Sequence, residues 1–372
     1  MAATSSTSSS DFPKATGVNP CVPTAFLLAI AILIAFELLL RTRDPHTLIA
    51  YPKRAAGDDQ TVTYRAVREY IALDGPAEVA LVGSSQMREG VTMPVLIDEI
   101  RARAGRDVRV ANYAARGARA DAMEAVVHYL LSQPTKPRLI VIGLSVRDLR
   151  TDDLDLPRMA VFWNARDWWR ETGKIGWRAT DVLPIVIRNE ASQVSWTLRF
   201  RDQLAIELVK PFARFGISVE SEGNPIVGDQ TLQHAGSRGL RNLTEIRIAP
   251  RRMLAAARLS YDYPAGPKPS ETMTLRLRSL LQQIELAGVR AIIVEMPVAD
   301  RLKTDLTRVG LLKWFNRSVT TLTIETPIRF IPTTAQPIQP GPEHFSDLQH
   351  HNRIGAELFS QWLAGEMAGE LK

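Results

Sequence analysis

Two short segments of this 372-residue chain carry side chains that could act together on a substrate. The first is Gly83-Ser84-Ser85, which directly follows the apolar run Val79–Val82. The second contains Asp347 and His350, three residues apart. A serine hydroxyl is too weakly acidic to attack a carbonyl group unaided, so it needs a histidine base that an acidic group orients. Ser85, His350 and Asp347 therefore predict a nucleophile, a general base and an orienting carboxylate for acyl transfer.

Other histidines are weaker candidates for the base. His344 and His351 lie close to His350, but neither of them follows an aspartate by three residues. The spacing of Asp, Glu and His shows no metal-ligand cluster, so we expect neither a metal nor a cofactor. The chain also lacks the Gly-x-Ser-x-Gly elbow of α/β-hydrolases.

The pattern of apolar residues indicates the elements that must position these side chains. Short apolar runs predict five strands, at 79–82, 108–112, 139–143, 290–295 and 328–331. Amphipathic stretches between them predict helices at 91–104, from Asp121 onward with a capping box to Glu124, at 271–286 before Gly288, and at 353–368. This alternation predicts an α/β fold in three layers, a mostly parallel five-stranded sheet with helices on both faces. Ligands of such sheets bind at the carboxyl ends of the strands.

Polar residues follow the predicted strands in an order that resembles the SGNH (GDSL-type) hydrolase superfamily. The four blocks are Gly83-Ser84-Ser85, the segment from Asn112 to Gly117, Ser145-Val-Arg-Asp148, and the segment from Asp347 to Ala356. The resemblance covers nearly all of residues 76–368 outside a long insertion. It implies the flavodoxin-like α/β architecture of that superfamily and a serine-dependent reaction at an ester.

The resemblance also assigns roles to individual residues. It implies that Ser85 is the nucleophile, that Asp347 and His350 complete the triad, and that the backbone N–H of Gly117 binds the oxyanion. Arg147 stands where the family has an oxyanion-binding asparagine. Two alternatives stay open: Arg147 is a charged oxyanion donor, or it forms a salt bridge with Asp148 and leaves two backbone donors.

The N-terminal region predicts a membrane anchor. Residues 1–21 are rich in Ser, Thr, Ala and Pro, and we expect a disordered tail. The apolar run from 22 to 40 would span about 28 Å as a helix, just enough to cross a bilayer. No small-x-small cleavage site follows it, so we interpret it as an uncleaved anchor and not as a signal peptide. Residues 41–75 are then a linker to a domain at 76–372, and Cys21, the single cysteine, can form no intrachain disulfide.

The orientation of this anchor is open. Lys14 alone precedes the span, whereas Arg41, Arg43, Lys53 and Arg54 follow it, which favours a cytoplasmic domain. The resemblance favours a single-pass membrane protein with an extracytoplasmic domain.

Residues 150–270 form an insertion between the third and fourth strands that contains Trp163, Trp168, Trp169, Trp177 and Trp196. A helix-like stretch covers 194–215. The insertion predicts a helical subdomain, with a sugar-stacking lid or a membrane-interface surface as alternatives. The basic residues Arg238, Arg241, Arg247, Arg251, Arg252 and Arg258 indicate a solvated face or a contact with anionic lipid or an acidic polymer. The net charge of +6 is mild and no nucleic-acid motif is present, so we expect no nucleic-acid partner.

These observations lead to one main hypothesis and two alternatives. The resemblance implies a membrane-anchored esterase or O-acyltransferase that acts on acyl esters, such as acetyl esters, of a cell-surface glycan. Its partners would be the lipid bilayer through residues 22–40, the glycan ester, and a multi-spanning acyltransferase of exopolysaccharide acetylation. A binding or assembly subunit that has lost catalysis is the first alternative, and a cytoplasmic lipid-ester hydrolase is the second.

Overall fold

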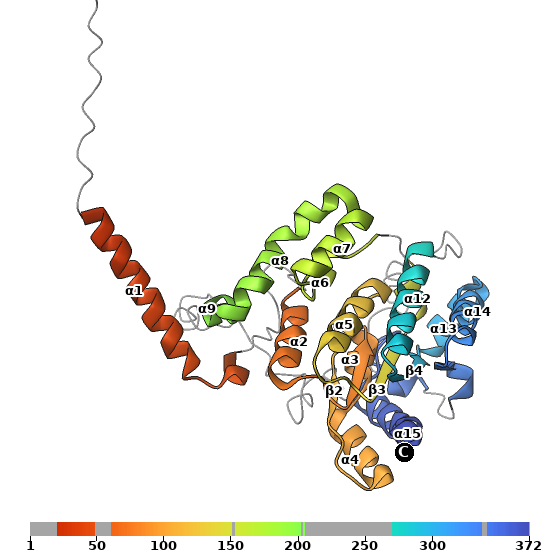
Figure 1. Ribbon diagram of the computed structural model, residues 1–372. Coiled ribbons are helices and arrows are strands. Elements are labelled where there is room, and N and C mark those ends of the chain that lie inside the picture. Colours follow the sequence, from red (N-terminus) through yellow and green to blue (C-terminus); the bar gives the residue numbers. More distant parts are fainter. Residues whose placement is uncertain are drawn as a thin grey trace, which may run out of the picture. The chain divides into compact units, whose positions relative to one another are not determined.

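The computed structural model describes residues 21–48, 61–150, 153–201, 204, 270–336 and 341–371. The chain divides into two compact units, Met1–Asp44 and Pro45–Lys372. Helix α1 (Cys21–Arg41) belongs to the first unit and is long and apolar enough to cross a membrane (Figure 1). It is the one such helix among the described residues, and it coincides with the predicted span at 22–40.

A five-stranded sheet forms the centre of the second unit. Its strands are β1 (Val79–Gly83), β2 (Val110–Asn112), β3 (Leu139–Leu144), β4 (Arg290–Glu295) and β5 (Arg329–Ile331). They are all parallel and lie in the order β2-β1-β3-β4-β5. The prediction of an α/β fold around a five-stranded parallel sheet is confirmed.

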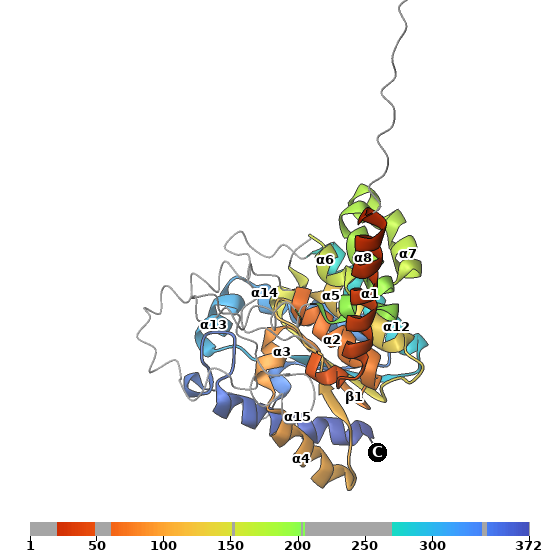
Figure 2. The same cartoon turned by 90° about the vertical axis from the view of Figure 1, so that its left-hand side faces the viewer.

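Helices cover both faces of this sheet (Figure 2). Helix α4 (Met93–Ala104) packs against α15 (Arg353–Leu371) on one face, and α5 (Ala120–Ser132) packs against α12 (Glu271–Leu286) on the other. Side chains alternate along a strand, so Val79 and Leu81 join the core with α4 and α15 while Ala80 and Val82 face the other layer. The predicted three-layer arrangement is present.

Two helix boundaries differ from the prediction around β1. The short helix α3 (Ser85–Gly90) begins directly after the strand and was not predicted. Val91 adopts an extended conformation at its end, and α4 then begins at Met93, with Pro94 in its first turn, where a missing N–H does no harm. Gly288, with φ of +67°, follows the end of α12 as predicted.

The predicted capping box at Asp121 is wrong. Helix α5 begins at Ala120, and the side chain of its N-cap residue, Arg119, makes no capping hydrogen bond. The fully buried Asp121 carboxylate accepts the backbone N–H of Ala122 and that of Asp155. Glu124 bonds to α12 instead, where Arg276 lies 3.0 Å away. Both carboxylates therefore hold other elements against α5.

Part of the predicted linker is folded. Residues Thr61–Asp74, inside the range 41–75, form helix α2, and its Tyr64 side chain is fully buried. Arg68 and Glu69 are buried as an ion pair of 3.1 Å, and Glu69 also bonds to Arg199. These charges are thus neutralised inside the domain, and α2 belongs to it and not to a linker.

The described part of the insertion is helical. It contains α6 (Leu156–Ala160), α7 (Ala165–Ile175), α8 (Ala179–Val194) and α9 (Trp196–Arg199). The predicted helix from 194 is interrupted at Ser195, whose hydroxyl caps α9 by accepting the N–H of Leu198. Residues 205–215, the arginine cluster and the N-terminal tail up to residue 20 lie outside the described residues.

The remaining elements connect the layers. Helices α13 (Asp300–Arg308) and α14 (Leu311–Ile324) lie between β4 and β5. Single 3₁₀ turns are η1 (Pro45–Leu48), η2 (Val146–Leu149), η3 (Gly176–Arg178), η6 (Thr333–Ala335) and η7 (Pro342–His344).

Candidate active site

Ser85 lies at the carboxyl end of β1, where the chain turns sharply from strand into helix α3. Gly83 makes this turn possible, because a Cβ there would lie 2.7 Å from the Met87 Cβ and 2.9 Å from the Gly143 carbonyl oxygen. Ser84 is the N-cap residue, and Ser85 is the first residue of α3. The close approach of the backbone therefore fixes where the Ser85 hydroxyl points.

The loop before α15 carries the other two candidate residues. Oδ1 of Asp347 accepts the backbone N–H groups of Gln349, at 2.7 Å, and of His350, at 2.8 Å. The loop closes through the N–H of Ser346, which donates to the carbonyl oxygen of His350 at 2.9 Å. Asn352 then caps α15 by accepting the N–H of Gly355 at 3.0 Å. The Asp347 carboxylate is thus held by its own backbone.

Three side chains from these segments form one chain of hydrogen bonds. The Ser85 Oγ lies 2.9 Å from Nε2 of His350, and Nδ1 of His350 lies 2.9 Å and 3.0 Å from the two oxygens of Asp347. An ionised carboxylate only accepts hydrogen bonds, so this contact places the imidazole proton on Nδ1. Nε2 is then the acceptor for the Ser85 hydroxyl. The arrangement allows His350 to remove the proton from Ser85 during a nucleophilic attack.

The two halves of this site are also joined directly. The side-chain amide of Gln86 donates to the carbonyl oxygen of Gln349 at 3.1 Å. The backbone N–H of Thr92 donates to the Ser360 hydroxyl of α15 at 2.7 Å. The contact of Gln86 was not predicted from the sequence. No local pattern indicates it, because the partner of Gln86 lies more than 260 positions away.

Gly117 lies at the same edge of the sheet as Ser85. The hydrogen bonds between β1 and the chain after β2 continue through Tyr113, which donates to Leu81, and Ala115, which donates to Gly83 at 3.0 Å. Gly117 follows in a turn with φ of +70°, a conformation that favours glycine. Its carbonyl oxygen accepts a bond from Arg158 at 3.1 Å.

Arg147 and Asp148 follow β3 in the turn η2. Asp148 is completely buried, and its Oδ2 accepts the N–H of Ser145 at 2.8 Å and the hydroxyl of Ser145 at 3.0 Å. Burial raises the pKa of Asp148 to about 6, while the charge of Arg147 and the bonds from Ser145 oppose the shift. In the part of the chain that the structure describes, Arg147 forms no salt bridge with Asp148. That alternative is therefore not realised, and the Arg147 side chain is half-buried.

The neighbouring histidines have structural positions. His351 is buried between the rings of Phe345 and Phe359, at centroid distances of 4.9 Å and 5.5 Å. Burial lowers the pKa of His351 to about 3, so it is neutral at physiological pH. Nδ1 of His344 accepts the N–H of Gly341 at 2.9 Å. Among the described histidines, His350 is the one that bonds to Ser85.

The described residues contain no group of three or more His, Cys, Asp or Glu side chains that could hold a metal ion. No protein-family model matches the chain, and no curated protein matches it significantly.

Proposed function

We propose that this chain is a membrane-anchored serine esterase or O-acyltransferase that acts on acyl esters of a cell-surface glycan. The observation that carries the proposal is the continuous chain of hydrogen bonds from the Ser85 hydroxyl through His350 to Asp347. The resemblance to the SGNH superfamily supplies the class of reaction, and the apolar helix α1 supplies the anchor.

In the first half of the reaction, Oγ of Ser85 forms a bond to the ester carbonyl carbon, and its proton passes to Nε2 of His350. The ester C–O bond then breaks, and the leaving alkoxide takes the proton from His350. The product is an acyl group on Ser85. Asp347 stays ionised and balances the positive charge on the imidazolium.

In the second half, water or a sugar hydroxyl attacks the acyl group on Ser85. His350 removes the proton of the acceptor and returns it to Oγ as the acyl–Ser85 bond breaks. Hydrolysis and transfer use the same residues, and they differ only in which acceptor reaches the site.

Backbone N–H groups stabilise the negative oxygen that forms in each half. Ser85 is the first residue of α3, where N–H groups have no partner within the helix. Gly117 supplies the second N–H, as the resemblance implies. Arg147 adds a charged group where the family has asparagine, and an Arg147→Ala variant should lose about 10²-fold to 10³-fold in kcat if it contacts the oxyanion.

The test uses the full chain reconstituted in nanodiscs, with p-nitrophenyl acetate as substrate and a fluorophosphonate as an active-site label. Ser85→Ala and His350→Ala should abolish both hydrolysis and labelling. Ser84→Ala is the matched control, because Ser84 is also a buried serine, one residue away, and its side chain does not cap α3. Hydrolysis that persists in Ser85→Ala would refute the proposal.

An alkaline phosphatase fusion at the C-terminus tests separately on which side of the membrane the domain lies. The proposal places the domain outside the cytoplasm, where it would act beside a multi-spanning acyltransferase, and it therefore predicts phosphatase activity. An inactive fusion would favour the cytoplasmic lipid-ester hydrolase.

A second candidate function is a glycan-binding or assembly subunit without catalysis. Arg147, in place of the family's asparagine, is the observation that favours it. A folded wild-type chain that neither hydrolyses the ester nor takes the label, with and without an acyl donor from the membrane, would support this second function.

A further inference from the structure

Helix α7 in the insertion buries two acidic side chains and exposes a tryptophan. Its buried residues are Asp167, Glu171 and Ile175, so two carboxylates face inward. Its tryptophan Trp169 is 69% exposed, and Trp177, in the turn η3 that follows, is 78% exposed. A helix that only covers a soluble domain places its apolar side chains inward and its charges outward. The cations Arg166, Arg170 and Lys174 of α7 follow that pattern, whereas its exposed tryptophan and its two buried carboxylates do not.

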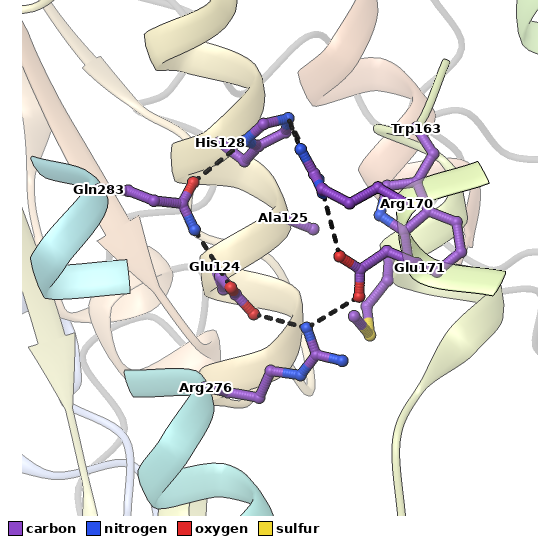
Figure 3. A pocket seen from close by; sticks show the side chains of 9 residues that line it. Glu124, Ala125, His128, Trp163, Arg170, Glu171, Arg276 and Gln283 are labelled. Atoms are coloured by element: carbon purple, nitrogen blue, oxygen red, sulfur yellow. Dashed lines mark hydrogen bonds and ion pairs between the residues drawn. The ribbon is translucent and has the colours of Figure 1, made fainter. Parts of the chain in front are cut away.

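The buried carboxylates hold α7 in this orientation (Figure 3). Glu171 lies 3.3 Å from Arg276 of α12, and Arg276 lies 3.0 Å from Glu124 of α5. Asp167 lies 2.9 Å from Nε2 of His128, also on α5. Because each carboxylate has a specific partner on the core helices, α7 cannot rotate to bury its tryptophans without breaking these pairs.

Burial disfavours ionisation of Glu171, but the hydrogen bond from Lys174 and the charge of Arg276 outweigh it and hold its pKa below the usual value. The same balance holds for Asp167, where His128 is the main partner that lowers the pKa. Both carboxylates are therefore ionised at neutral pH, and both are turned away from solvent.

The exposed side of α7 and η3 combines indole rings with cations. We call this surface the tryptophan face and define it by Arg166, Trp169, Gly173 and Trp177, all of which are exposed. Spacings of three and four residues place Arg166, Trp169 and Gly173 on one side of α7. Further cations border the face, at Arg170, Lys174 and Arg178. Arg170 pairs with Asp167 at 3.1 Å and Lys174 pairs with Glu171 at 2.7 Å, so the positive charge of this surface comes from Arg166 and Arg178.

The tryptophan face is also rigid. Trp168 packs edge-on against Trp169, with ring centroids 4.7 Å apart, and its Nε1 donates to the carbonyl oxygen of Ala179 at 3.1 Å. Trp168 is therefore held by the backbone and packs against the exposed ring of Trp169. Leu286 and Ile324 are also exposed, but each is the last residue of its helix.

We propose that the tryptophan face lies in the headgroup layer of a bilayer that contains anionic lipid. Indole rings prefer the membrane–water interface because they are apolar and also carry an N–H donor, and Lys and Arg are attracted to anionic headgroups. Helix α1 is apolar enough to tether the same chain to a membrane, which keeps lipid at a high effective concentration. This inference does not depend on the chemistry of Ser85.

The test places a spin label in the middle of the face without removing either tryptophan. The full chain with Cys21→Ser provides a cysteine-free background, and Gly173→Cys introduces the labelling site. A Cβ at Gly173 would have no atom within 4 Å, so the label causes no strain. Gly369→Cys is the matched control, because Gly369 is also an exposed helical glycine with open space around its Cβ.

The labelled chains are reconstituted into phosphatidylcholine vesicles with and without phosphatidylglycerol, and collision with oxygen and with a water-soluble nickel complex is measured. At position 173 the ratio of oxygen to nickel collisions should rise roughly threefold when phosphatidylglycerol is present. At position 369 it should stay at the value for water.

In the double variant Trp169→Gln, Trp177→Gln, the ratio of oxygen to nickel collisions at position 173 should fall to the value for water. The hydrolysis of a soluble ester should be unchanged. Equal nickel access at 173 and 369 in phosphatidylglycerol vesicles would overturn the proposal. Protection of 173 in detergent without lipid would also overturn it and would indicate a protein or sugar contact. A chain that does not float with the vesicles would count against it as well.

Discussion

Asp347→Asn tests how far the reaction depends on the carboxylate behind His350. Asparagine keeps a side-chain oxygen that can accept the N–H groups of Gln349 and His350, so the loop should keep its shape. It removes the negative charge, and its amide group donates toward Nδ1 of His350. The imidazole proton then moves to Nε2, where it opposes the transfer of the Ser85 proton.

The expected magnitude follows from the geometry. The contact between Nδ1 of His350 and Asp347 is 2.9 Å, and the two side chains are 13% and 28% exposed. Opposite charges about 4 Å apart attract by roughly 4 kcal/mol at an effective dielectric constant of about 20. Partial exposure reduces this to about 3 kcal/mol, which is roughly a hundredfold in rate. With the change of tautomer, kcat should fall by about 10²-fold to 10⁴-fold.

The assay is the hydrolysis of p-nitrophenyl acetate by the full chain in nanodiscs. Asp98→Asn is the control, because it removes an exposed carboxylate that pairs with Arg101 on α4, and it should change kcat by less than about twofold. If Asp347→Asn keeps more than about a third of the wild-type kcat while Ser85→Ala is inactive, Asp347 does not orient the base, and the reasoning fails.

Three further predictions concern stability. Burial lowers the pKa of His351 to about 3, so below about pH 6.5 the unfolded chain binds a proton that the folded chain does not, and stability is lost as the pH falls. In His351→Gln the difference between the urea midpoints at pH 4 and pH 7 should therefore shrink, and an unchanged difference would contradict this. Burial raises the pKa of Asp148 to about 6, so its contribution to stability is lost as the pH rises through that value. Asp148→Asn should gain roughly 2 kcal/mol in unfolding free energy relative to wild type between pH 4 and pH 7, and a constant difference would exclude this effect. A Cβ at Gly355 would lie 2.2 Å from the His344 carbonyl oxygen, so Gly355→Ala should lower the melting temperature by roughly 5–10 °C and abolish ester hydrolysis. Gly369→Ala, with open space around the new Cβ, should do neither.

The strands were predictable because they are short apolar runs, most of whose side chains are buried. In β1 and β3 every side chain is inaccessible, so the sequence has no polar position to obscure the pattern. The proximity of Ser85 and His350 was predictable for a related reason. Each follows or precedes a clear element, and the parallel order of the strands brings such ends to one edge. Their catalytic roles stay a prediction.

The errors arose where a charge has its partner far away in the sequence. Asp121 looks like the start of a capping box, but it bonds to the backbone of Asp155, and Glu124 bonds to Arg276. The linker at 41–75 was predicted without the contacts of α2, where Glu69 bonds to Arg199, 130 positions away. A local pattern assigns exposed positions to such residues, because it cannot include partners that only the folded chain supplies.

The distance in sequence between Ser85 and His350 determines how late during synthesis the two residues can meet. The two residues are 265 positions apart, and the loop that carries His350 leads directly into α15, which packs on α4. At about 5–20 residues per second, a ribosome makes Ser85 roughly 15–50 s before His350. During that interval Ser85 has no contact with His350. A partly synthesised chain therefore lacks the hydrogen bond between them, which forms only when the last helix of the domain docks.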